Sequence, residues 1–136
     1  NYDKLVAEAK KIKNLEFLES VPFKEIEKYF ANAKVLVNTS DSEGFPNTFI
    51  QACKTSTAIL SYNVNPDDFL NKFDCGIDAN NDFRNLKEGL ENMLKSDMFL
   101  ELGQNANSYF MKNHNVADIA NDYANIFKDL VRGDDC

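Results

Sequence analysis

The fold is decided by the stretch Val35-Leu36-Val37-Asn38-Thr39-Ser40-Asp41-Ser42-Glu43-Gly44-Phe45-Pro46-Asn47-Thr48-Phe49-Ile50-Gln51-Ala52. The short, β-branched run 35–37 predicts a buried strand. A polar loop follows, and the fixed φ of Pro46 suits the first turn of a helix. That helix has an apolar face, formed by Phe49, Ile50 and Cys53. Ile59-Leu60 predicts a second strand, and the order strand, loop, helix, strand is typical of a parallel α/β unit.

The loop from Ser40 to Thr48 is the candidate ligand site, because ligands of parallel α/β sheets bind where strands end and helices begin. The first N–H groups of a helix lack intrahelical partners, and the helix dipole makes that end slightly positive. A phosphate or a sugar hydroxyl can therefore bind there without a cationic side chain. The alternative is that Ser40, Asp41 and Ser42 only form a turn and cap the helix.

The segment Ser40–Ala52 resembles the donor-binding segment of the family 4 retaining glycosyltransferases, which have the two-domain GT-B fold. The family pattern there is Ser, two variable positions, Glu-Gly-Phe-Gly or Pro-Asn, three mostly apolar positions and Glu-Ala. The resemblance extends to Leu15–Leu18 with Val21-Pro22, and to Tyr29–Val37. It implies that residues 1–136 form the second half of a C-terminal domain that binds a nucleotide-diphosphate sugar donor.

The resemblance implies donor-binding roles for Glu43, Gly44, Phe45, Asn47, Thr48 and Gln51. Glu43 would accept hydrogen bonds from sugar hydroxyls, and Gly44, Phe45, Asn47 and Thr48 would present backbone groups to the sugar and the diphosphate. Gln51 stands where the family usually has a Glu that binds the ribose, so a weaker, uncharged hydrogen bond is expected there. Val21 would hold the nucleobase, although a Val-Pro pair before a helix is often only a hydrophobic staple and a first-turn proline.

Other features of the family are missing from the sequence. No upstream strands, no basic pair for the leaving diphosphate and no catalytic histidine of an acceptor domain precede Leu15. We therefore expect a partial domain without catalytic residues, inactive without its N-terminal acceptor domain. The resemblance implies metal-independent, retaining transfer of a hexosyl unit with no cofactor beside the donor. It also implies a cytoplasmic enzyme, with peripheral membrane association of the full-length protein.

Composition narrows the classes of partner. The net charge of −7 and the pI near 4.7 argue against nucleic acid or an anionic membrane as the main partner of the chain.

Cys53, Cys75 and Cys136 are odd in number and widely spaced, which argues against a disulfide framework or a zinc site. We expect Cys53 and Cys75 to be buried in a reducing compartment. His114 is expected to mark a helix end, not a catalytic base. No signal peptide or membrane span is predicted.

Hydrophobic periodicity predicts about four mostly parallel strands, flanking helices and a helical C-terminus. Together with these elements, the resemblance implies a three-layer, Rossmann-like half domain. The predicted strands are 15–18, 35–37, 58–62 and 75–78. The predicted helices are 2–11, 23–32, 46–53, 66–71, 83–94, 96–112 and 116–131. Asn80-Asn81-Asp82 and Ser96 are expected to cap the helices that follow them, and Gly133 is expected to stop the last one.

Apolar residues at helical spacing predict which faces are buried. The inward-facing set is expected to be Phe23, Ile26, Tyr29, Phe30, Phe83, Leu86, Leu90, Met93, Leu94, Phe99, Leu100, Leu102, Ala106, Tyr109, Phe110, Ile119, Ala120, Tyr123, Phe127 and Leu130. The strand at Leu15 has no obvious neighbour, so either it pairs directly with that at Val35 or another chain completes the sheet edge.

Two functions from different classes fit the sequence. The first is part of a glycosyltransferase, and the second is a non-catalytic α/β module that uses the same loop for a regulatory ligand or a partner protein. Gln51, Ser56 and the missing basic pair motivate the second. A receiver-like signalling domain fits poorly, because Glu19 is the only acid near the end of the first predicted strand.

Overall fold

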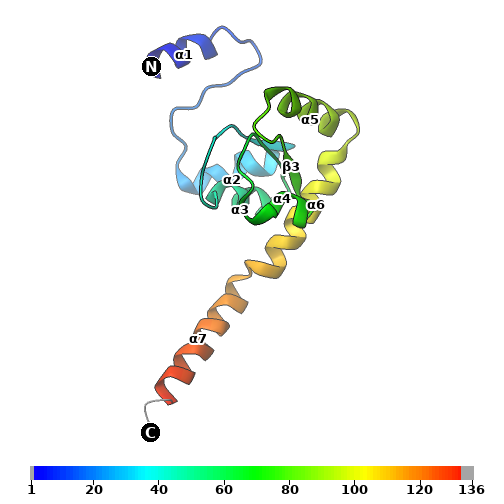
Figure 1. The fold of residues 1–136 in the computed structure, drawn as a ribbon. Coiled ribbons are helices and arrows are strands. Elements are labelled where there is room, and N and C mark those ends of the chain that lie inside the picture. Colours follow the sequence, from blue (N-terminus) through cyan, green and yellow to red (C-terminus); the bar gives the residue numbers. More distant parts are fainter. Residues whose placement is uncertain (1, 133–136) are drawn as a thin grey trace.

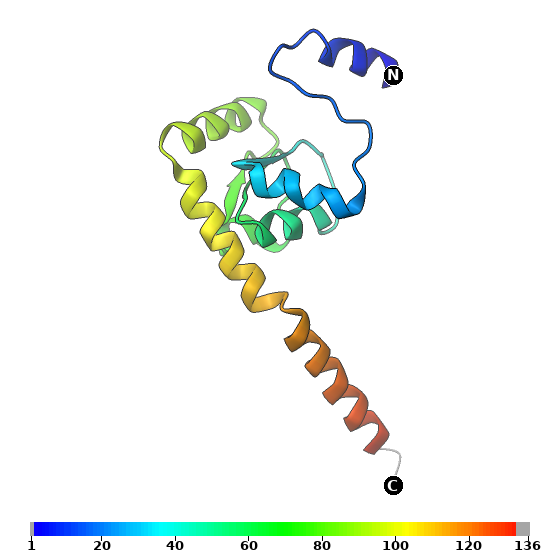
Figure 2. The ribbon, with the colours of Figure 1, turned by 180° about the vertical axis from the view of Figure 1, so that it is seen from behind.

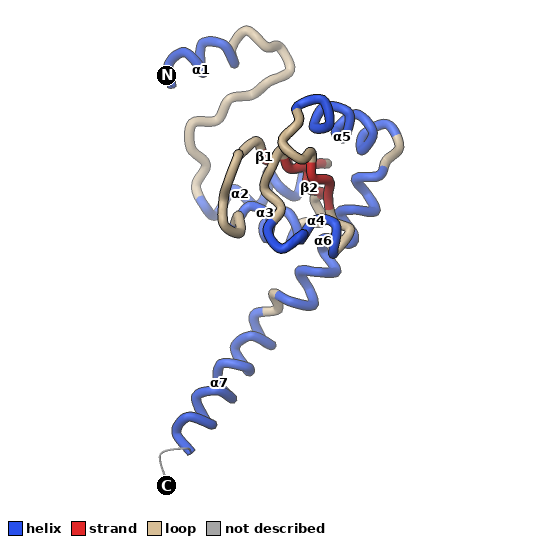
Figure 3. The backbone as a smooth tube through the Cα atoms, viewed as in Figure 1, coloured by secondary structure: helices blue, strands red, loops and turns tan. Residues whose placement is uncertain are grey.

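A computed structural model describes residues 2–132, and its centre is a sheet of three parallel strands (Figure 3). The strands are β1 (Val35–Asn38), β2 (Ala58–Ser61) and β3 (Gly76–Asp78), in the order β1-β2-β3. β1 pairs with β2 in parallel, and β2 with β3 likewise. All four residues of β2 are buried, as is typical of a central strand covered on both faces.

Helices link and cover the strands (Figure 1). The elements that connect one strand to the next are α3 (Asn47–Lys54), η1 (Pro66–Asp68) and α4 (Phe69–Lys72). The remaining helices of the body are α2 (Phe23–Asn32), which packs beside α3, α5 (Phe83–Lys95) and α6 (Met98–Asn113). The α/β class, the parallel sheet and the flanking helices are as the sequence predicts.

Two apolar clusters form the core on the two faces of the sheet, because side chains alternate along a strand. Ile59 belongs to a cluster with Phe49 of α3, Leu70 of α4 and Ala106 of α6. The neighbouring β2 residues Ala58 and Leu60 belong to the other cluster, with residues of α5 and α6 such as Met93 and Leu102. Helix α6 thus contributes to both clusters.

The segment Leu15–Leu18 is a loop, so the prediction of a strand there is wrong. Within residues 2–132 no strand pairs with it, and an unpaired strand has no hydrogen bonds to hold it extended. Leu15, Phe17 and Leu18 are exposed. The chain runs through this loop to α1 (Tyr2–Ala9), which lies away from the body in both views and contacts the loop through Tyr2 and Phe17 (Figures 1 and 2).

Several inward-facing assignments in the body are also wrong. The exposed side chains are those of Phe23, Tyr29, Phe83, Leu94 and Leu100. Each lies at a helix end or at the margin of the apolar face, where periodicity places it inward but no neighbouring element covers it. Ser96 does not cap α6, because its hydroxyl donates to the carbonyl of Asn92 at the end of α5. Asp82 does cap α5, by accepting from the N–H of Arg84 at 2.7 Å.

The last helix, α7 (Val116–Arg132), extends away from the body as a separate arm (Figures 1 and 2). Its predicted inner face is exposed at all five positions: Ile119, Ala120, Tyr123, Phe127 and Leu130. The break between α6 and α7 falls at His114 and Asn115, as predicted. The predicted stop at Gly133 lies outside the described residues.

Cys53 and Cys75 are buried and reduced, as predicted, while Cys136 lies outside the described residues. The pKa of the Cys53 thiol is raised, mainly by the hydrogen bond with Cys75 and secondly by burial. The thiol therefore stays protonated and is a poor nucleophile. Over residues 2–132 no group of His, Cys, Asp and Glu side chains is arranged to hold a metal ion. Nor does any helix in that range have the length and apolar character needed to cross a bilayer.

Candidate functional site at the carboxyl edge of the sheet

Asn38, the last residue of β1, organises the loop that carries Glu43. Its Nδ2 donates to Oε1 of Glu43 at 3.0 Å, and its Oδ1 accepts from the N–H of Ser40 at 2.9 Å. Its backbone carbonyl accepts from the N–H of Tyr62 at 2.8 Å, which ties the end of β1 to the end of β2. These three bonds fix the start of the loop at the carboxyl edge of the sheet. The sequence analysis gave Asn38 no role, although an Asn that ends a strand is a common start of such a turn.

Glu43 is exposed and ionised at neutral pH. Side-chain hydrogen bonds, first with Ser40 and then with Asn38, lower the pKa of its carboxyl group. Glu43 belongs to none of the ion pairs formed among the described residues. The carboxylate therefore keeps acceptor capacity for hydroxyl groups, and charge-assisted hydrogen bonds are stronger than neutral ones.

Helix α3 follows the loop of Glu43 and starts with free N–H groups. The residue before the helix is Pro46, with φ −66° and ψ 126°, so Pro46 precedes the first turn instead of lying in it. The carbonyl of Pro46 accepts from the N–H of Phe49 at 3.0 Å. No side chain caps α3, and over residues 2–132 the N–H groups of Asn47 and Thr48 have no protein acceptor. The alternative that Ser40 to Ser42 cap this helix is therefore wrong.

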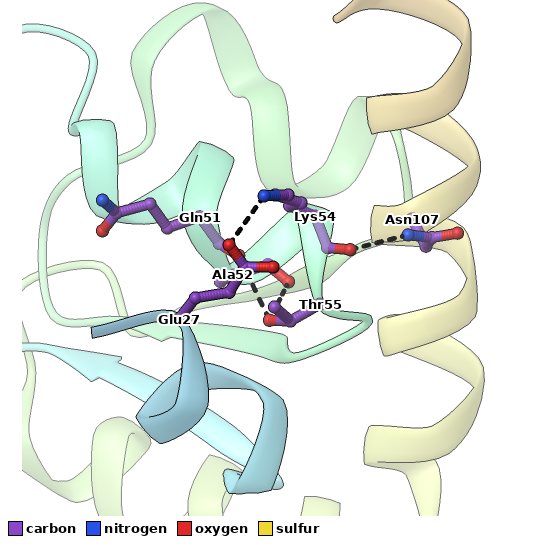
Figure 4. Close-up of polar contacts among 6 residues, drawn as sticks. All are labelled: Glu27, Gln51, Ala52, Lys54, Thr55 and Asn107. Carbon is purple, nitrogen blue, oxygen red and sulfur yellow. Dashed lines mark hydrogen bonds and ion pairs between the residues drawn. The ribbon is translucent and has the colours of Figure 1, made fainter. Parts of the chain in front are cut away.

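Contacts on three sides hold α3 in place. Near its C-terminal end, Lys54 Nζ forms an ion pair with Glu27 of α2 at 2.7 Å, and Asn107 of α6 donates to the Lys54 carbonyl at 3.1 Å (Figure 4). Near its N-terminal end, the ring of Phe45 packs edge-on against Phe69, with 5.0 Å between centroids. The free N–H groups thus lie on a fixed helix, and a fixed donor loses little entropy when a ligand binds.

The predicted donor-binding residues of α3 share its outer face. Asn47 and Thr48 are exposed, Gln51 follows one turn later, and Phe49 is buried on the opposite side. Gln51 lines a cavity of about 150 Å³ between α2 and α3, together with Phe23, Ile26, Glu27 and Lys54. The Gln51 side chain extends away from Asn107 (Figure 4). The free N–H groups and the cavity thus belong to the same helix, and Gln51 is the predicted donor-binding residue that lines the cavity.

Val21 lies apart from that cavity. It lines a separate apolar groove of about 300 Å³ along β1, whose walls also include Leu18, Tyr29 and Val37. Of the predicted site residues, Glu43, Gly44 and Phe45 therefore lie on the loop, and Asn47, Thr48 and Gln51 lie on α3. Val21 lines a different depression from Gln51.

Gly44 is surrounded by open space. A Cβ atom built on it would meet no heavy atom within 4 Å. No glycine of the described residues has a positive φ, so the backbone at Gly44 adopts a conformation open to any residue. Neither packing nor conformation requires a glycine here.

Comparisons with known proteins agree with the motif. A family model described as "Glycosyl transferases group 1" matches residues 1–109, which include the sheet, the loop and α3. No curated protein and no solved structure matches the chain. Since the match covers most of the 136 residues, the chain belongs to the family of glycosyl transferases group 1.

Proposed function

We propose that this chain binds a nucleotide-diphosphate sugar and forms the donor half of a retaining, metal-independent hexosyltransferase of family 4. One observation carries the proposal: an ionised carboxylate, Glu43, is held by Asn38 in the loop that leads directly into α3, and the first two N–H groups of α3 are unpaired. Such N–H groups suit a diphosphate, and the carboxylate suits sugar hydroxyls. A single strand–loop–helix unit thus offers hydrogen-bond donors for the diphosphate and an acceptor for the sugar.

Each predicted residue has a role in this proposal. Glu43 accepts from hydroxyls of the sugar, and the backbone of Gly44 and Phe45 lies along its ring. The N–H groups of Asn47 and Thr48 bind the diphosphate. Gln51, one turn further on, accepts from a ribose hydroxyl. Val21 remains the proposed nucleobase contact. For this contact, the loop before α2 would have to move toward the cavity at Gln51.

The reaction needs a second domain. We infer that an N-terminal domain supplies the acceptor site and the catalytic groups, and that the chain alone binds the donor without transferring the sugar. The proposed location of the enzyme is the cytoplasm, with peripheral membrane association of the full-length protein and no cofactor beside the donor. The acidic surface makes nucleic acid a poor partner.

A titration with UDP and with GDP, followed by amide NMR shifts, tests the donor site. We expect the amides of Gly44, Asn47 and Thr48 to shift with one of the two nucleotides at millimolar concentration. Glu43→Gln, which keeps the shape but removes the charge, should leave nucleotide binding intact and weaken binding of the matching nucleotide sugar about tenfold. Unmoved amides, or equal affinity of the variant for the sugar nucleotide, contradict the proposal.

Gln51 favours the second candidate, a non-catalytic module that binds a nucleotide or a partner protein, because a neutral amide holds ribose less strongly than a carboxylate. Gln51→Glu tests the ribose contact. If Gln51 contacts ribose, the variant should bind the nucleotide several-fold more tightly, since the new bond is charge-assisted. An unchanged or weaker affinity argues against a ribose contact and favours a module that binds a partner protein.

A further inference from the structure

We propose that the cavity between α2 and α3 takes the nucleobase of the donor, that this base is a pyrimidine, and that the ring of Phe23 stacks on it. This inference rests on the proposed function, because it names the class of nucleotide that the same donor site would bind. Three features of the cavity point to this ligand: its size, its exposed aromatic wall and its position along α3.

The cavity has the size of one six-membered ring. Its volume is about 150 Å³, and a protein cavity of about this volume holds a single benzene ring. A pyrimidine base is one six-membered ring, whereas a purine adds a fused five-membered ring. A purine would therefore have to displace a wall of the cavity, and those walls are two helices that pack against each other.

Phe23 gives this cavity an aromatic wall that adds little to the core. It is the first residue of α2, and its side chain is 81% exposed, the highest value for a large apolar side chain within residues 2–132. Ile26, one turn further along α2, lines the same cavity but packs against the core. The ring of Phe23 is thus free to stack on a base, and it already lines the cavity that Val21 would have to approach.

The order of groups along α3 matches the order of parts in a nucleotide. In a nucleoside diphosphate, the ribose lies between the diphosphate and the base. The free N–H groups of Asn47 and Thr48 begin the helix, Gln51 follows one turn later, and Lys54 follows after a further turn. Gln51 and Lys54 line the cavity from this side. A diphosphate at the start of α3 would thus direct the ribose to Gln51 and the base into the cavity.

The polar wall of the cavity offers both a donor and an acceptor to the edge of a base. Nζ of Lys54 and Oε2 of Glu27 form an ion pair at 2.7 Å, and within residues 2–132 neither end group makes another hydrogen bond (Figure 4). Lys54 thus keeps N–H donors and Glu27 keeps an acceptor oxygen. Uracil and cytosine each carry donors and acceptors, so both can bond here. Because both charged side chains are about half exposed, these bonds should add less than the stacking does.

Calorimetric titration with UDP, CDP, GDP and ADP tests the choice of base, because the four share the ribose and the diphosphate. We expect UDP or CDP to bind about tenfold more tightly than either purine nucleotide. In Phe23→Ala the affinity for that pyrimidine nucleotide should fall about tenfold, and Phe23→Tyr should retain it, because the stacking face is kept. Phe83→Ala is the matched control and should change nothing, since Phe83 is also an exposed first residue of a helix but does not line this cavity.

Inorganic pyrophosphate separates this inference from the proposed function, because it has no base. Its effect on the amide shifts of Asn47 and Thr48 should be the same in the wild type and in Phe23→Ala. A pyrimidine preference that is lost in Phe23→Ala, together with that equal effect, supports the nucleobase cavity.

Equal affinity for the four nucleotides, a purine preference, an unchanged affinity in Phe23→Ala or an equal loss in Phe83→Ala overturns the nucleobase cavity. Amide shifts at Asn47 and Thr48 would in those cases still support the donor site. Pyrimidine-selective binding that depends on Phe23 but moves neither amide would contradict the diphosphate site and leave the nucleobase cavity standing.

Discussion

Helices α6 and α7 follow one another in the chain, have similar lengths and both carry apolar residues at helical spacing, yet one is packed and the other is not. Helix α6 contacts α3, α5 and two strands, and buries Leu102, Gly103 and Ala106. The large apolar side chains of α7 are exposed, from Ile119 at 37% to Val116 at 78%. The family match ends at residue 109, near the C-terminal end of α6.

The contrast shows what a hydrophobic pattern specifies. Periodicity determines which side of a helix is suited to burial, but not whether the chain supplies a surface to cover it. In α6, Gly103 lets the backbone approach Ser56 closely. Helix α7 also carries small residues, such as Ala120, but it extends away from the body and, within the described residues, packs against no strand or helix of the sheet (Figures 1 and 2).

Gly103→Ala should have the largest effect on stability, because it changes a buried residue of the packed helix α6. A Cβ atom at position 103 would lie 2.1 Å from the carbonyl oxygen of Ser56, which belongs to the backbone and cannot rotate aside. Overpacking of this kind costs about 3 kcal/mol, and the better helix propensity of Ala offsets about 1 kcal/mol of it. We expect urea denaturation to show a loss of about 2 kcal/mol in the free energy of unfolding.

Gly44→Ala is the matched control, because a Cβ atom there meets nothing within 4 Å. Its free energy of unfolding should stay within about 0.5 kcal/mol of the wild-type value. If the two glycine variants lose equal stability, α6 is not packed against the start of β2 as described. A Gly44→Ala variant that is stable but binds nucleotide sugar weakly would sharpen the role proposed for Gly44.

Thr57→Val should have the second-largest effect, and it tests how the body holds α2. The Thr57 hydroxyl is buried, donates to the carbonyl of Phe30 at 2.8 Å and lies 2.9 Å from the hydroxyl of Thr55. Val keeps the shape but removes the donor, so we expect thermal or urea unfolding to show a loss of about 1 kcal/mol. Thr39→Val, at an exposed position, is the control and should be neutral. Equal stability of both variants would mean that this hydrogen bond does not hold α2.

The sequence predicts most of the packed body and fails outside it, and the reason is physical. Strands β1, β2 and β3 and helices α2, α3 and α5 follow from local apolar patterns, because in each case the chain also supplies the partner element. Leu15–Leu18 has a strand pattern without a partner, so it stays a loop. Phe83 has a core pattern, but it is the first residue of its helix and packs on Tyr62 instead.

Truncation of the exposed stripe of α7 should have almost no effect on stability. Tyr123 and Phe127 are 60% and 63% exposed, so the double variant Tyr123→Ala/Phe127→Ala removes little buried surface. We expect the free energy of unfolding to change by less than about 0.5 kcal/mol for each substitution. A loss several times larger, especially one that depends on protein concentration, would mean that the stripe is covered in solution and that α6 and α7 differ less than described.

The bonds inside the loop could not be predicted from the sequence. The resemblance of the motif implied donor-binding roles for Glu43, Asn47 and Thr48, and these roles stay predictions. It did not indicate that Asn38 holds Glu43, because that bond depends on how the loop folds back over the end of β1. It also did not separate Val21 from Gln51, since the path of the chain before α2 depends on the loop at Leu15–Leu18.

The smallest effect is expected on the exposed loop, in the ionisation of Glu43. Hydrogen bonds with Ser40 and Asn38 lower the pKa of this carboxyl group, so Ser40→Ala and Asn38→Ala should each raise it toward the ordinary value for Glu. Because the pKa is lower in the folded than in the unfolded protein, ionised Glu43 favours folding at neutral pH, and this contribution disappears as the pH falls through the folded-state pKa. An NMR titration of the Glu43 side chain measures the shift, and Ser42→Ala is the control. An unchanged pKa in both variants would mean that Ser40 and Asn38 do not hold the carboxylate, and the loop of Glu43 would then lack the bonds that distinguish it from an open surface turn.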